Sequence, residues 1–173
     1  MLVVPDKNLR LGWSQWSYEL LDADERLAKM TVPAKAARGG TIQIGTAEYS
    51  ITSQGDDAGP FQMCLAKQPV AFAAAARHLS ALTARFDYTI QQEARRFSLI
   101  SREAIWKRDG GFDVICDQTG QVIGDIRLEP LALITTGRII VDLAADIPPE
   151  ARAFLVWVAL ALLRKMSEYG TVA

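Results

Sequence analysis

The sequence predicts a mainly β domain, an antiparallel barrel or sandwich, with one buried helix near its C-terminus. Short apolar or alternating segments recur over residues 16–143, and turn residues separate them about every eight to twelve residues, which is typical of this class. A wholly apolar stretch then follows Pro148 and Pro149. The chain has 173 residues, half of them hydrophobic, so it suits a single domain, 1–173.

The strand segments follow from the alternation of side chains. In residues 85–90, Phe86, Tyr88 and Ile90 would face the core, because successive side chains on a strand point to opposite faces. Residues 41–44 repeat this pattern on a smaller scale. The other predicted strands are 16–21, 26–32, 47–52, 61–66, 70–75, 96–100, 104–106, 112–116, 122–128 and 139–143, which makes about a dozen in all.

Two hairpins and one ambiguous segment complete the β region. Residues 18–30 and 112–126 both consist of an apolar strand, a turn that begins with aspartate, and a returning strand. Residues 70–79 are rich in alanine and would also form a short helix on propensity alone. We predict a strand over 70–75.

The C-terminal segment predicts a helix over about 149–167. Prolines suit its first turn, Glu150 complements the positive end of the helix dipole, and Arg164 and Lys165 complement the negative end. Residues 153–163 are apolar on every face, so this part belongs inside a protein or inside a bilayer. About eleven residues span roughly 16 Å, whereas a bilayer core needs about twenty residues. The helix is therefore predicted to be buried in the domain and not to cross a membrane.

Composition and charge narrow the environment and the partners. Nineteen basic and 20 acidic residues leave a net charge of −1, so no global field attracts nucleic acid or an anionic membrane, and either partner would have to bind a local patch. Residues 1–7 lack the pattern of a secretory signal, so we expect a cytoplasmic protein. Cys64 and Cys116 lie in separate apolar segments without a C-x-x-C motif, and we expect free buried thiols, with a disulfide as the alternative.

The order of elements resembles the tubby C-terminal-like superfamily, which includes tubby domains, phospholipid scramblases and LURP-one-related proteins. About a dozen strands, the hairpin 112–126, the approach to the helix over 139–149 and the apolar helix itself carry this resemblance over residues 16–166. It implies a roughly twelve-stranded antiparallel barrel closed around a buried C-terminal helix. The chain departs from scramblases in lacking a cysteine cluster, and no compact signature of the tubby phosphoinositide site is present.

The densest group of basic residues is the candidate binding site. It comprises Arg95, Arg96, Arg102, Lys107 and Arg108, which fall on two adjoining predicted strands and their turn. Neighbouring strands lie about 4.8 Å apart, so such residues can form one patch that holds a phosphate or lipid headgroup. Alternating acids, including Glu93, Glu103 and Asp109, make an ordinary charged surface the alternative.

No motif for catalysis, cofactor binding or metal binding was found. His78 is the only histidine, and Asp56 and Asp57 lack the number and spacing of ligands in a calcium loop. We therefore expect a binding module without enzymatic activity, cofactor or metal, whose partner is an anionic phospholipid headgroup or a protein. A barrel with an internal or rim site for a small ligand or a reaction is the competing class, but the helix would fill that interior.

Overall fold

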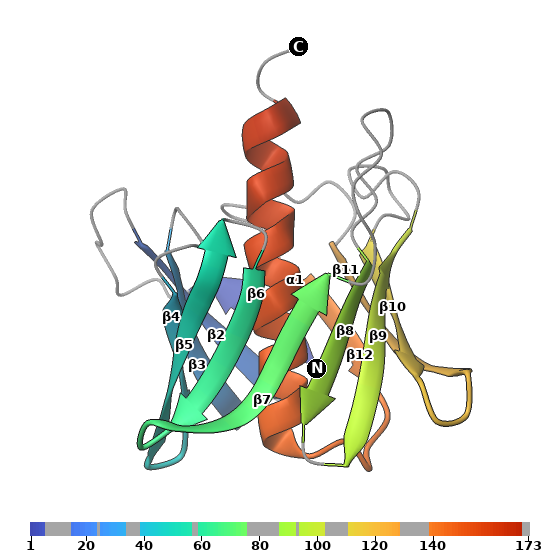
Figure 1. Cartoon of the computed structure of the whole chain (residues 1–173), viewed down its shortest axis with the longest axis horizontal. Helices are drawn as coiled ribbons and strands as arrows, with labels where there is room; N and C mark the ends of the chain where they lie inside the picture. The colour runs from blue at the N-terminus through green and yellow to red at the C-terminus, as the bar shows by residue number, and fades with distance from the viewer. Residues whose placement is uncertain are drawn as a thin grey trace.

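The chain forms a closed barrel around a helix. The computed structural model describes residues 1–5, 15–23, 25–33, 39–56, 59–75, 87–92, 94–102, 111–128 and 139–170. Within them, twelve antiparallel strands surround α1, Pro149–Gly170 (Figure 1). The strands are β1 Leu2–Pro5, β2 Gln15–Asp22, β3 Glu25–Pro33, β4 Gly40–Ile44, β5 Ala47–Asp56, β6 Gly59–Leu65, β7 Gln68–Ala75, β8 Asp87–Gln92, β9 Arg95–Ser101, β10 Gly111–Cys116, β11 Gln121–Leu128 and β12 Ile139–Leu143. The predicted fold class is confirmed.

Strand β1 closes the barrel and was not predicted. It pairs with β2 on one side and with β12 on the other, and the amine of Met1 donates a hydrogen bond to the Val141 carbonyl at 2.8 Å. Four residues that end in proline give too short an alternation to recognise from the sequence. The predicted strand 104–106 and residues 85–86 of another lie outside the described residues.

The interior is filled by α1. Every side chain from residue 153 to residue 163 is buried, as expected for a helix that is apolar on all faces. Strands supply the other half of the core by alternation: in β12, Ile139, Val141 and Leu143 are buried while Asp142 is exposed. The buried-helix prediction is confirmed for these residues.

Trp157 fixes the helix against β3 and β4. Its indole Nε1 donates a hydrogen bond to the Thr31 carbonyl at 2.8 Å, so the one polar atom of the ring is satisfied. Its ring meets Phe61 edge-on, with centroids 5.3 Å apart. Gly40 leaves room for it, since a Cβ there would lie 2.9 Å from two ring atoms.

The alanine-rich segment is a strand, as predicted. In β7, Ala71 and Ala73 are buried on the inner face, while Phe72 is 39% exposed on the outer face. Small inward side chains give the helix room, which explains why this position in the barrel favours alanine. Tertiary packing therefore overrides the helix propensity of alanine here.

The two ends of the barrel differ in how the strands are joined. We call the end where α1 begins the base and the other end the top, as they stand in Figure 1. At the base the connections are residues 23–24, 45–46, 66–67, 93–94, 117–120 and the segment 144–148 that leads into α1. At the top they are residues 6–14, 34–39, 57–58, 76–86, 102–110 and 129–138.

Candidate functional site

The five predicted basic residues are divided between the two ends of the barrel. Arg95 and Arg96 begin β9 at the base, and Arg102 follows β9 at the top. A strand rises about 3.3 Å per residue, so Arg95 and Arg102 stand roughly 23 Å apart. Lys107 and Arg108 lie outside the described residues, in the segment that joins β9 to β10. Arg95 and Arg102 cannot hold the same phosphate group.

Arg95 and Arg96 also differ from each other. Consecutive residues on a strand point to opposite faces. Arg95 reaches the segment before α1, where its guanidinium donates to the Asp146 carbonyl at 2.8 Å and lies 3.6 Å from the Asp146 carboxylate. Arg96 is exposed and stands opposite Gln91 of β8, which is also exposed. The Arg95 guanidinium therefore contacts the segment before α1, whereas Arg96 lies on the exposed face of β9 beside Gln91.

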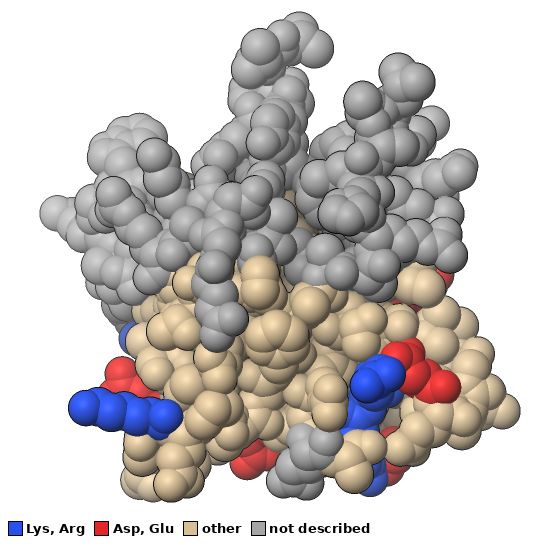
Figure 2. Space-filling model, viewed as in Figure 1, with Lys and Arg blue, Asp and Glu red and all other residues tan. Residues whose placement is uncertain are grey.

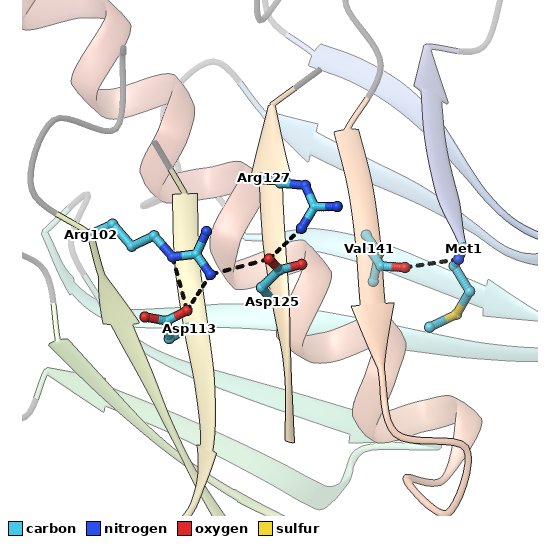
Figure 3. Close-up of polar contacts among 6 residues, drawn as sticks. All are labelled: Met1, Arg102, Asp113, Asp125, Arg127 and Val141. Atoms are coloured by element: carbon cyan, nitrogen blue, oxygen red, sulfur yellow. Dashed lines mark hydrogen bonds and ion pairs between the residues drawn. The ribbon is translucent and has the colours of Figure 1, made fainter. Parts of the chain in front are cut away.

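Arg102 belongs to an ion-pair cluster on the outer face of β10 and β11 (Figure 3). Its Nε donates to Asp113 Oδ1 at 2.9 Å, and its Nη2 donates to Asp125 Oδ2 at 3.1 Å. Arg127 donates to the same Asp125 oxygen. The hydrogen bond with Asp113 is the main reason why the pKa of Arg102 is raised above its ordinary value.

This cluster balances its own charge. Asp113 and Asp125 stand directly opposite each other on paired strands, an arrangement of like charges that destabilises a sheet by itself. Arg102 lies between them, so its charge is already used within the protein. The sequence showed both aspartates in the hairpin 112–126, but their pairing depends on strand register, which the sequence did not predict. On the face shown in Figure 2, described charges of both signs lie near one another without forming a broad patch of one sign.

Both cysteines are free and half-buried, which confirms the free thiols but not their full burial. Cys116 ends β10, and the turn after it bonds back, with the amides of Thr119 and Gly120 donating to the Cys116 carbonyl. Hydrogen bonds from the Thr119 side chain, then from the Thr119 and Gln118 backbone, lower the pKa of the Cys116 thiol below its ordinary value. The base thus holds one thiol with enhanced thiolate character.

A polar pair lies at the base of the interior. Tyr49 of β5 is buried, and its phenol is hydrogen-bonded to Glu150 in the first turn of α1. Burial, followed by the charge of Glu150 and this hydrogen bond, raises the pKa of Tyr49. Because the phenol donates and the carboxylate accepts, the pair anchors the helix start to β5.

The remaining sequence candidates receive little support. His78 and Asp57 lie outside the described residues, as does the side chain of Asp56. Within the described ranges, no group of three or more His, Cys, Asp or Glu side chains is arranged to hold a metal ion. No helix in the described part of the chain is long and apolar enough to cross a membrane.

No family model, curated protein or solved structure matches the chain. The resemblance to the tubby C-terminal-like superfamily, drawn from the order of elements in the sequence, therefore stays a prediction.

Proposed function

We propose that this chain is a non-enzymatic binding module of the tubby-like type that contacts anionic lipid headgroups from the cytoplasm through the top of its barrel. The observation that carries the proposal is the filled interior. The side chains of residues 153–163 occupy the space in which a small-ligand barrel keeps its site, so recognition falls to the outer surface and the ends.

The distribution of charge favours the top. The connections at the top contain ten basic and five acidic residues, whereas those at the base contain one basic and four acidic residues. The segments that join strand ends at the top contain the basic residues Lys7, Arg10, Lys35, Arg38, Arg77, Arg85, Arg102, Lys107, Arg108 and Arg138 and the acidic residues Asp6, Asp57, Glu103, Asp109 and Glu129, of which the structure describes only Arg102. At the base they are Lys67 against Asp24, Glu93, Asp117 and Asp146. A chain with a net charge near zero thus has connections of opposite net charge at its two ends.

Within the predicted site, Lys107 and Arg108 become the residues on which the proposal depends. Arg102 is paired with Asp113 and Asp125, and Arg95 is paired with Asp146. A basic residue near an anionic bilayer contributes about 1 kcal/mol to binding. Removing two such charges should therefore weaken binding roughly ten-fold or more.

A co-sedimentation assay at two salt concentrations tests the proposal. It compares vesicles of phosphatidylcholine alone with vesicles that also contain about 30% phosphatidylserine, an anionic lipid whose attraction for basic residues salt would screen. We expect the parent to bind only the anionic vesicles and to dissociate as salt rises, because the attraction is screened. Lys107→Gln with Arg108→Gln should weaken binding. Arg26→Gln with Lys67→Gln removes the same charge from exposed residues at the base and serves as the matched control.

Two results would overturn the proposal. One is a parent protein that ignores anionic vesicles at low salt. The other is an equal loss of binding in both double variants, since that would place the contact elsewhere than the top. Circular dichroism of each variant confirms that exposed charges were removed without unfolding the barrel.

A further inference from the structure

Two arginines hold three successive backbone carbonyls of the segment 144–148, which joins β12 to α1. Arg152 donates from Nε to the Ile147 carbonyl at 2.7 Å and from Nη2 to the Ala145 carbonyl. Arg95 donates to the Asp146 carbonyl between them at 2.8 Å. Arginine suits this role because its planar fork presents several donors in fixed directions.

The two arginines come from different parts of the barrel. Arg152 belongs to the first turns of α1, is only 12% exposed, and lies 3.8 Å from the carboxylate of Asp22 at the end of β2. Arg95 belongs to β9, and its side chain is 47% exposed. One arginine thus fastens the segment to the helix and to β2, and the other fastens it to β9.

The segment also closes the base with an apolar side chain. Ile147 is 2% exposed and belongs to the hydrophobic core. The backbone hydrogen bonds of the segment are from the Ala144 amide to the Ile123 carbonyl, from the Ile147 amide to the Ala144 carbonyl, and from the Arg152 amide to the Pro148 carbonyl. Pro148 and Pro149 have no amide to donate. Between its backbone bonds to β11 and to the start of α1, the segment is therefore attached by the buried Ile147 side chain and two guanidinium groups.

We infer that residues 144–148 form a latched lid over the base, which opens as a unit while the barrel stays closed. Opening the lid breaks the arginine contacts and exposes Ile147. The apolar area exposed in this way is far smaller than the area exposed when α1 leaves the barrel. Segments with few buried contacts open locally below the free energy of global unfolding. The lid does not depend on the proposed lipid contact at the top.

Native-state hydrogen exchange of the full chain tests the lid without any substitution. The Ala144 and Ile147 amides should exchange faster than amides of residues 153–163, and their exchange should respond only weakly to low denaturant. If these amides match those of the helix in both rate and denaturant dependence, they open only by global unfolding, and the lid inference is wrong.

Arg95→Gln tests the latch itself. It should raise exchange at Ala144 and Ile147 roughly three- to ten-fold and leave residues 153–163 unchanged, because one half-exposed charged hydrogen bond is lost. Arg26→Gln is the matched control, since Arg26 is 59% exposed and pairs with Glu19 at 3.4 Å but does not contact the lid. Arg152→Lys keeps the charge and loses the fork, and should raise exchange further. Unchanged exchange in Arg95→Gln, or an equal rise across the chain, would refute the latch.

Discussion

The base and the top of the barrel hold the same helix in different ways. At the base, polar contacts anchor the start of α1: Tyr49 bonds to Glu150, and Arg152 bonds to the segment that precedes the helix. Towards the top, the anchor is an aromatic ring, because Trp157 packs on Phe61 and bonds to Thr31 near the end of β3. The connections at the base have two to five residues, whereas all but one of those at the top have six or more, and the connections at the top contain most of the basic residues among the connections.

We propose that this difference separates stability, at the base, from recognition, at the top. Buried apolar contacts and short turns hold the described barrel together, so substitutions at the base should mainly change its stability. The segments that join strand ends at the top contain ten of the eleven basic residues found in the connections, and connecting segments commonly carry binding residues. If this separation is correct, substitutions in the two regions should differ in their effects on stability, and the predictions below test that difference.

The largest effect is expected from Trp157→Ala. The substitution removes a fully buried ring, its hydrogen bond to Thr31 and its contact with Phe61, and should cost about 3–5 kcal/mol of unfolding free energy. Leu160→Lys, which places a charge in the core, should prevent folding altogether. Val122→Ala at the base is the control, because Val122 is 62% exposed. Urea denaturation measures Trp157→Ala and Val122→Ala, and circular dichroism shows whether Leu160→Lys folds. A Trp157→Ala protein within about 1 kcal/mol of the parent would contradict a helix anchored in the core.

Gly40→Ala and Gly45→Ala compare a glycine near the top of the barrel with a glycine at the base. A Cβ at Gly40 would overlap the Thr31 carbonyl and lie 2.9 Å from the Trp157 ring, so we expect a loss of about 2 kcal/mol. Gly45→Ala meets no atom within 4 Å and should cost about 1 kcal/mol, only because its φ is +57°. Equal losses in thermal or urea denaturation would show that Trp157 tolerates displacement.

Arg102→Gln tests the ion-pair cluster at the top. It leaves Asp113 and Asp125 facing each other without the cation between them, and should destabilise the protein by about 1 kcal/mol. Arg127→Gln removes a cation that contacts Asp125 alone, so its effect should be smaller. A double-mutant cycle of Arg102 with Asp113 gives the coupling, and zero coupling would mean that the cluster contributes nothing to stability.

Cys116 provides the finest test, at the base. Since hydrogen bonds from the 117–120 turn lower its pKa, its alkylation rate should reach half of its maximum at a pH below the ordinary value for a thiol. Thr119→Val removes the largest cause and should move the midpoint upward. Iodoacetamide kinetics against pH, in a Cys64→Ser background that leaves one thiol, measure this shift. An identical midpoint in both proteins would show that the turn does not hold the thiolate.

The sequence predicted those features that depend on neighbours along the chain. Alternation located β3 and β12, turn residues separated β10 from β11, and an apolar stretch too short for a bilayer identified the buried part of α1. Such features are local, so they can be recognised before the fold is known.

Only the tertiary structure decided which distant residues meet. β1 is a strand because β2 and β12 leave an open seam beside it, and residues 70–75 are extended because their small inward side chains face the helix. Arg95 and Arg102 are close in sequence, but they lie at opposite ends of β9, roughly 23 Å apart, so the predicted basic group is divided between the two ends of the barrel. Asp113 opposes Asp125, and Arg95 reaches Asp146, through strand register and barrel closure. These contacts depend on the whole set of pairings, whereas composition and periodicity report only on each segment.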